Sequence, residues 1–295
     1  MVELLLSMNI PRIFLICSLL TSLVFCQDAV SDSEKRYCHA VIPCPVLNSP
    51  DFQKVFGGNS GKTVKVDRKG LIRELEFIAF PGTSFEVISE IPVSGQSILE
   101  VRTQDYPYNT PLFIDSRFVA FSGKKVPERE KTLPPAREIL SAMKAMEGRP
   151  YMWGGNYHSG IKELPDFYPP RGQVPSAMLS LWRLEGVDCS GLIYQASGGY
   201  TPRNTSSMLT YGEGLAISGM TAEEISRMVE PLDLIVWIGH VVIVLSPDEV
   251  IESTHPEGVI ISEMIPRLRS IMPDRKPANE WDGRGKSFVI RRWHR

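Results

Sequence analysis

Short runs of β-branched and aromatic residues, separated by Gly, Pro and Asn, fill residues 27–125 of the chain. Runs of this length with turn residues between them predict β strands rather than helices. Five such strands in fewer than 100 residues predict a small barrel or sandwich. The expected strands lie within residues 62–70, 71–80, 84–95, 97–103 and 111–121.

The pattern changes after a polar, proline-containing stretch, residues 122–135. Residues 135–148 have apolar positions at helical spacing and end on Gly148, which predicts a helix. Residues 188–199 and 221–230 predict two more helices. Apolar β runs then predict an antiparallel sheet, so the order of elements indicates an α+β fold. The expected strands lie within residues 232–239, 240–246, 249–254, 258–265 and 286–294.

The first 26 residues differ from both regions, with Arg12 followed by an apolar run over residues 13–26. A run of this length is too short to span a bilayer and is typical of a signal peptide. A buried N-terminal helix is the alternative, and Cys26 also leaves lipoprotein anchoring open. The expected organisation is a signal peptide (1–26), a β domain (27–125), a linker (126–134) and an α+β domain (135–295).

Composition and charge narrow the function classes. The chain has 295 residues, 43% hydrophobic and 22% charged, which suits two globular domains. A formal net charge of −2 and scattered Lys and Arg give no basis for nucleic-acid binding. No later segment reaches 18 apolar residues, so no membrane span is expected. The chain lacks metal-ligand motifs, and we expect no metal and no cofactor.

The five cysteines lie at positions 17, 26, 38, 44 and 189. Cys38 and Cys44 are near enough in sequence to form a disulfide in an oxidising compartment. Cys189 then has no partner. It is either buried and inert or kept for its reactivity.

Cys189 stands in the first turn of the expected helix, where free N–H groups and the helix dipole favour a thiolate. A thiolate nucleophile needs a base, and His240, at the start of an apolar strand after Gly239, is the best placed histidine. An antiparallel return of the next strand brings Glu252 alongside His240, where a carboxylate would fix the imidazole. His255 is the alternative to Glu252.

The segments YMWGG, DCSG before an apolar helix, LDLIVW and GHVVIVL with EVIES resemble, in this order, the motifs of the NlpC-type papain-like peptidoglycan peptidases. The resemblance covers roughly residues 135–265. It implies that Cys189 is the nucleophile, His240 the base and Glu252 the third residue, where the family often has His. It also implies that Tyr151 helps to stabilise the oxyanion. Trp153 would form a wall of the cleft, or be a plain core aromatic.

A subgroup that joins an N-terminal bacterial SH3-like barrel to this peptidase resembles the chain more closely. It cleaves γ-D-glutamyl–diamino acid bonds in stem peptides with a free N-terminal L-alanine. The resemblance implies that Asp188 pairs with the substrate ammonium, that Ser190 assists, and that barrel residues close the pocket. The candidates for the barrel residues are Glu76, Glu100, Tyr106 and Tyr108.

The chain departs from the family in residues 156–187, where a much shorter link is usual. Residues 157–172 indicate a loop and residues 176–186 an extra helix, which either cover the cleft or decorate the surface. The expected function is an exported cysteine endopeptidase of the cell envelope acting on peptidoglycan stem peptides. A non-catalytic wall-binding protein and an acyltransferase on the same scaffold are the alternatives.

Overall fold

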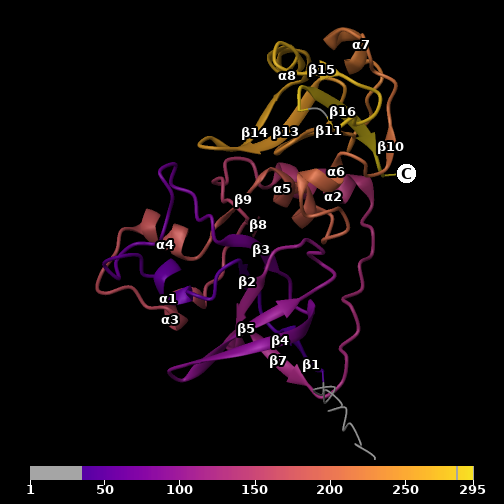
Figure 1. The fold of residues 1–295 in the computed structure, drawn as a ribbon. Helices are drawn as coiled ribbons and strands as arrows, with labels where there is room; N and C mark the ends of the chain where they lie inside the picture. The colour runs from indigo at the N-terminus through magenta and orange to yellow at the C-terminus, as the bar shows by residue number, and fades with distance from the viewer. Residues whose placement is uncertain (1–34, 284, 295) are drawn as a thin grey trace, which may run out of the picture. The chain divides into compact units, whose positions relative to one another are not determined.

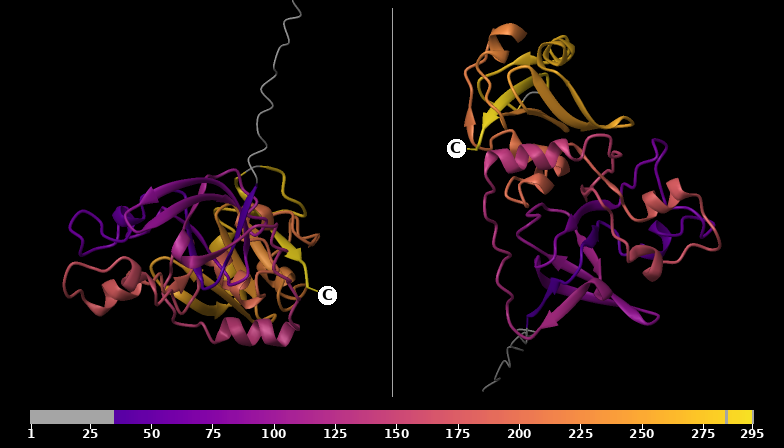
Figure 2. Two further views of the ribbon diagram at one scale, coloured as in Figure 1. Left: turned by 90° about the horizontal axis from the view of Figure 1, so that it is seen from below. Right: turned by 180° about the vertical axis from the view of Figure 1, so that it is seen from behind.

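The computed structural model describes residues 35–283 and 285–294, and the expected signal segment, with Cys17 and Cys26, lies outside them. Two large, mainly antiparallel sheets organise the described residues, one formed by the N-terminal half and one by the C-terminal half (Figure 1), and a small two-stranded sheet lies outside them. The right-hand view of Figure 2 shows an extended stretch of chain between the last strand of the first sheet and the first long helix. Within the described ranges, none of the helices has the length and apolar character needed to cross a membrane.

The N-terminal sheet has seven strands in the order β3-β2-β6-β5-β4-β1-β7. Four of the five predicted strand segments are confirmed, and the segment 111–121 is divided by a short 3-10 turn, η1 (Ser116–Phe118). Two strands before residue 48 were not predicted. The strands are β1 (Arg36–Ala40), β2 (Cys44–Leu47), β3 (Leu75–Ala79), β4 (Ser84–Val93), β5 (Gln96–Arg102), β6 (Leu112–Asp115) and β7 (Val119–Ser122), and one short helix, α1 (Phe52–Val55), follows β2.

The prediction of a strand at residues 62–70 is wrong, because this segment is a loop. The Asp67 carboxylate accepts hydrogen bonds from the backbone N–H groups of Lys69 at 2.7 Å and Leu71 at 3.0 Å. An aspartate that bonds its own backbone in this way stabilises a turn in competition with strand pairing.

The expected disulfide between Cys38 and Cys44 is also wrong, since both are free, buried thiols. Cys38 lies on β1, which pairs with β4 and β7, whereas Cys44 begins β2, which pairs with β3 and β6. The two strands are therefore not neighbours in the sheet, and closeness in sequence alone does not produce a disulfide.

The C-terminal sheet has the order β10-β16-β11-β12-β13-β14, with β15 added beside β16. Helices cover both faces, as Figure 1 shows for α7 and α8 on one side and α2, α5 and α6 on the other. Side chains alternate between the two faces of the sheet. Val236 and Ile243 pack on the face covered by α2, α5 and α6, whereas Ile235 and Val242 pack on the face covered by α7 and α8. The elements are α2 (Ala136–Lys144), α5 (Cys189–Ala196), α6 (Thr205–Met208), β10 (Glu213–Gly214), α7 (Ala222–Ser226), β11 (Leu234–Trp237), β12 (His240–Val244), β13 (Glu249–Thr254), β14 (Gly258–Glu263), α8 (Met264–Ile271), β15 (Lys276–Pro277) and β16 (Ser287–Arg292).

The segment 156–187 contains a helix where one was predicted, and it packs on the N-terminal sheet. Tyr168 stacks on the rings of Phe52 and Phe56, and the indole N–H of the fully buried Trp182 donates to the Tyr168 carbonyl at 2.9 Å. Residues of this segment thus complete the core of the N-terminal half. Its elements are β8 (Asn156–Tyr157), α3 (Leu164–Phe167), α4 (Ser176–Trp182) and β9 (Gly186–Val187).

Candidate active site

Cys189 is the first residue of α5, and Asp188 is the N-cap. The Asp188 side chain accepts a hydrogen bond from the backbone N–H of Gly191 at 2.6 Å, which satisfies one of the free donors of the first turn. Aspartate before a helix is a common start signal, so the sequence itself places the thiol at the helix N-terminus.

Two glycines allow the helix start to lie against the aromatic turn at residues 151–155. A Cβ on Gly191 would lie 1.9 Å from the Gly155 carbonyl oxygen, and one on Gly155 would lie 2.8 Å from the Gly186 carbonyl oxygen. The same Gly155 carbonyl accepts the Asp188 N–H at 2.9 Å. The two motifs are therefore joined backbone to backbone, and only glycine fits at the contact.

His240 opens β12 and is oriented by a buried carboxylate. Its Nε2 lies 2.6 Å from Oε2 of Glu252 on β13, and the Glu252 side chain is 1% exposed. His255, the alternative partner, instead has its ring centroid 5.7 Å from that of Tyr151. Because Nε2 faces Glu252, Nδ1 is the ring nitrogen left to exchange a proton with a reacting group.

Arg267 on α8 adds a partner that the sequence did not indicate. Its Nε donates to Oε1 of Glu252 at 2.5 Å and its Nη2 to Oε2 at 2.8 Å. Burial alone would raise the pKa of Glu252, but the hydrogen bonds and charges of His240 and Arg267 outweigh it and lower that pKa. The carboxylate is thus kept ionised beside the imidazole.

The Cys189 thiol lies against the backbone on both sides of His240. Its sulfur is 4.0 Å from the Gly239 carbonyl oxygen, and the backbone N–H of Val241 interacts with it as a donor. The helix that carries the thiol packs on β12 and β13, the strands of His240 and Glu252. A thiol, an imidazole and a carboxylate are therefore gathered from one helix and two adjacent strands.

The expectation that the helix N-terminus makes Cys189 a thiolate does not hold in the structure. Burial, and after it the charge of Asp188, raise the pKa of the Cys189 thiol to about 12, although the N–H groups of Val241 and Ser190 act in the opposite direction. The side chain is only 6% exposed, and desolvation of the anion outweighs the helix end. The resting group is a neutral thiol that needs a base.

Tyr151 lies close enough to Cys189 for the charge of the thiolate to affect the pKa of the tyrosine hydroxyl. Burial and then the charges of Asp188 and Cys189 raise the pKa of the Tyr151 hydroxyl. The hydroxyl therefore keeps its proton over the physiological range and is able to donate a hydrogen bond.

Asp188 forms a buried ion pair with Arg203, which the sequence did not reveal. The Arg203 guanidinium, buried behind the helix start, contacts both Asp188 oxygens at 2.7 and 3.0 Å and the Ser190 hydroxyl at 2.9 Å. The carboxylate is therefore held in one position by this partner. Arg203 stands in a loop segment without periodicity, so no pattern marks it.

Two of the four candidate residues from the N-terminal sheet lie together. The Tyr106 hydroxyl donates to Glu76 at 2.5 Å and accepts from the Asn204 side chain at 3.1 Å, next to Arg203. The Tyr108 hydroxyl contacts Ser207 at 3.0 Å. Glu76 and Tyr106 thus reach the site, whereas Glu100 bonds Ser89 on the N-terminal sheet.

Trp153 is partly exposed, at 37%, and is not a plain core aromatic. The guanidinium carbon of Arg73, from the loop before β3, lies 4.1 Å from the centre of its ring. The contact joins the aromatic turn to the N-terminal sheet.

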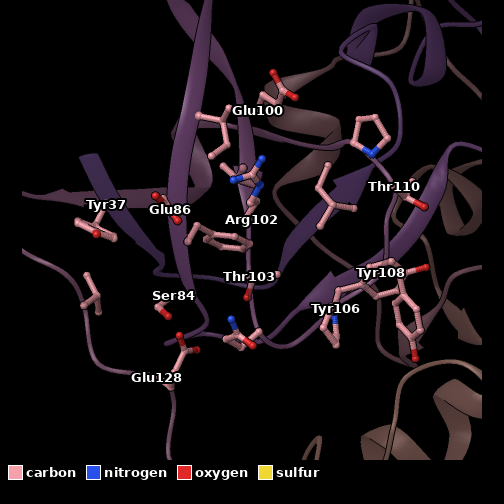
Figure 3. Close-up of a pocket in the computed structure, with 18 of the residues that line it drawn as sticks. Tyr37, Ser84, Glu86, Glu100, Arg102, Thr103, Tyr106, Tyr108, Thr110 and Glu128 are labelled. Atoms are coloured by element: carbon pink, nitrogen blue, oxygen red, sulfur yellow. The ribbon is translucent and has the colours of Figure 1, made fainter. Parts of the chain in front are cut away.

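A cavity of about 480 Å³ opens on the N-terminal sheet, and its lining includes none of Cys189, His240 and Glu252. Figure 3 shows Arg102 between Glu86 and Glu100, with Tyr106 and Tyr108 at one end of the cavity. The two tyrosines therefore belong both to this cavity and to the contacts with Asn204 and Ser207. Within residues 35–283 and 285–294, no group of three or more His, Cys, Asp or Glu side chains is arranged to hold a metal ion.

No family model matches the chain, and no curated protein matches it. Among solved structures, an NlpC/P60 family protein from Bacillus cereus is similar at 14% identity and a TM-score of 0.34, over 88% of this chain and 64% of that one. RipD from Mycobacterium tuberculosis, described as a non-catalytic NlpC/p60 domain protein adapted to peptidoglycan binding, is similar at 18% identity and a TM-score of 0.33, over 53% and 95%. An NLP/P60 family protein from Staphylococcus aureus, described as similar to lipoprotein, gives 16% identity and 0.29, over 58% and 46%. The chain thus spans less than two thirds of the Bacillus cereus protein, and the functional assignment depends on the side-chain geometry above.

Proposed function

We propose that the chain is a cysteine endopeptidase of the NlpC/P60 type that acts in the cell envelope. It cleaves the γ-D-glutamyl–diamino acid bond of peptidoglycan stem peptides with a free N-terminal L-alanine. The observation that carries the proposal is the arrangement of Cys189 beside the backbone that flanks His240, with His240 held by Glu252 at 2.6 Å.

The reaction begins with a neutral thiol, as burial requires. Nδ1 of His240 takes the proton as the Cys189 sulfur attacks the γ-carbonyl carbon, and Glu252 stabilises the imidazolium that forms. The Tyr151 hydroxyl and the N–H groups at the start of α5 donate to the oxyanion. His240 returns the proton to the leaving amine, and water then hydrolyses the thioester.

The substrate ammonium is held between the N-terminal sheet and the helix start. Glu76, with Tyr106 bonded to it, supplies a carboxylate, and Asp188 with Ser190 forms the opposite wall. Trp153 flanks the cleft. A closed end of this kind would admit a free amine and exclude a longer chain, so we expect a preference for short stem peptides.

The test is release of the diamino acid product from a defined tripeptide by the purified protein, followed by mass spectrometry. Cys189→Ala is expected to abolish release, because no other group on the described site is a nucleophile of this kind. Cys38→Ala, which removes a buried thiol of the N-terminal sheet, is the control and is expected to retain activity. Full activity in Cys189→Ala contradicts the proposal.

One observation favours a second function, non-catalytic wall binding: the Cys189 thiol is nearly buried and its pKa is raised. The two functions differ in the reactivity of the thiol, since an inert buried thiol is labelled slowly. Because the resting thiol is neutral, labelling of Cys189 by a thiol probe at neutral pH is expected to depend on His240 as the base, and the rate to fall in His240→Ala. Slow labelling that does not depend on His240, together with peptide binding, supports the binding protein.

A further inference from the structure

We propose that Arg73 binds a carboxylate of the substrate beside the scissile bond, and that this contact selects acidic stem peptides over amidated ones. The inference rests on the proposed function and assigns a specificity residue from the N-terminal sheet to the same site.

The guanidinium of Arg73 is fixed in position by two contacts, but some of its hydrogen-bond donors have no acceptor among the described residues. It stacks over Trp153 at 4.1 Å, and its Nε donates to Asp67 at 2.7 Å. Neither Nη atom has a hydrogen-bond partner among the described residues, and the side chain is 41% exposed. An arginine stacked by its face presents its edge N–H groups in one plane, which matches the two oxygens of a carboxylate.

The position of Arg73 is fixed by its neighbours on both sides. Asp67 is itself held by the N–H groups of Lys69 and Leu71. Gly154, next to Trp153, lies so close to the Leu75 carbonyl that a Cβ would be 2.3 Å from its oxygen. The loop that carries Arg73 is thus in direct contact with the aromatic turn of the active site.

The charge of Arg73 also reaches the catalytic side of that turn. Burial dominates the raised pKa of Tyr151, and Arg73 is one of the charges that act against it. Arg203 and Arg267 each contact their carboxylates, Asp188 and Glu252, through two guanidinium nitrogens, whereas Arg73 contacts Asp67 through Nε alone. Arg73 therefore keeps its two Nη groups as donors for an incoming anion on the side of Tyr151 and Trp153.

The chemistry of the substrate supplies that anion. A γ-linked glutamyl residue keeps its α-carboxylate on the residue whose side-chain carbonyl reacts, and the diamino acid carries carboxylates on the other side of the bond. Either source places a negative charge within a few bonds of the reacting carbon. The ligand class is a peptide carboxylate, and amidation distinguishes the two sources.

The experiment measures binding by calorimetry in the inactive Cys189→Ala background with three tripeptides: unmodified, amidated at the glutamyl α-carboxyl, and amidated at the diamino acid carboxyls. One of the two amidations is expected to weaken binding about tenfold to hundredfold, and adding Arg73→Gln is expected to remove that difference. Arg73→Lys keeps the charge without the planar fork and is expected to recover only part of it.

Arg68→Gln is the matched control, because Arg68 is an exposed arginine of the same loop with no contact to Trp153. The inference is overturned if Arg73→Gln remains as sensitive to amidation as its parent, if Arg68→Gln has the same effect, or if no tripeptide binds. Binding that depends on Arg73 without cleavage by the wild-type protein contradicts the proposed function alone. Cleavage that is indifferent to Arg73 contradicts this inference alone.

Discussion

At the scale of single residues, Glu252 is a buried carboxylate of the site that is held by both His240 and Arg267. It is buried, accepts from His240 and Arg267, and remains ionised because these two partners outweigh the cost of burial. A carboxylate in this position holds the imidazole in one orientation and stabilises the imidazolium that forms during the proposed reaction. Removing the charge should therefore affect both turnover and the response of the protein to pH.

We predict that Glu252→Gln lowers kcat/KM by at least about tenfold, since the amide cannot stabilise the imidazolium. Because the folded-state pKa of Glu252 lies below its ordinary value of 4.5, its contribution to stability is complete above that pH. The contribution is lost as pH falls through the folded-state pKa. Urea unfolding from pH 7 to pH 3 should show an acid loss in the wild type that is smaller in Glu252→Gln.

Glu257→Gln is the control for this prediction, because Glu257 is an exposed residue of the turn between β13 and β14. It should keep the wild-type acid profile and the wild-type activity. A Glu252→Gln protein with unchanged kcat/KM would remove Glu252 from the mechanism, and an unchanged acid profile would show that its ionisation is not linked to folding.

Gly191 is a second residue with a sharp expectation. A Cβ at this position would lie 1.9 Å from the Gly155 carbonyl oxygen, which is a backbone atom. Gly191→Ala should destabilise the protein by about 2 kcal/mol or more through overpacking, and should reduce activity by moving Cys189. Thermal and urea unfolding measure the loss. Gly123→Ala, at a site with nothing within 4 Å, should change little, and equal stability of the two variants would contradict the packing argument.

At the scale of elements, β3 links the N-terminal sheet to the site through its backbone at Ile78 and the side chain of Glu76. The Asn156 amide forms two hydrogen bonds of 2.8 Å with the backbone of Ile78, like a neighbouring strand, and Glu76 on the same strand meets Tyr106. The strand is therefore fixed in register where it presents the proposed ammonium site.

The proposed ammonium site predicts that the wild type cleaves a tripeptide with a free N-terminus faster than its N-acetylated form. Glu76→Gln should reduce this preference about tenfold, since a charge-assisted hydrogen bond is lost. Competition between the two peptides, followed by mass spectrometry, gives the ratio directly. Glu74→Gln is the control, because Glu74 lies two residues earlier, in the turn before β3, and is paired with Lys65. A preference that survives Glu76→Gln would place the ammonium elsewhere.

Elements also decide how much of the site the sequence reveals. Cys189, His240 and Glu252 follow from local patterns, because a helix start, a strand start and a tight return each have a sequence signature. Arg267 was missed because residues 258–265 favour a strand, and α8 begins inside that run at Met264. Arg203 and the contact of Arg73 with Trp153 depend on chain segments far apart in sequence, which periodicity does not relate. The protonation state of the Cys189 thiol was missed because the local sequence marks a helix start but does not show how deeply a side chain is buried.

At the scale of the whole molecule, residues 156–187 connect the two halves in an unexpected way. They follow the aromatic turn and precede Cys189 in sequence, yet Tyr168 and Trp182 lie in the core of the N-terminal sheet. Each end of the segment is therefore attached to the active site, while its middle is attached to the other half. Such a connection makes independent unfolding of the two halves costly, because opening one core removes the anchors of the other.

We predict from this that the described chain unfolds in one cooperative transition. Trp182→Ala should lower the free energy of unfolding by about 3 to 5 kcal/mol, since it empties a fully buried site. Differential scanning calorimetry should show a single peak that moves to lower temperature as a whole, with calorimetric and van't Hoff enthalpies in agreement. Trp281→Ala, a partly buried indole at the edge of the C-terminal core, should cost less. Two separate peaks, of which only one moves in Trp182→Ala, would mean that the halves unfold independently and that the segment does not couple them.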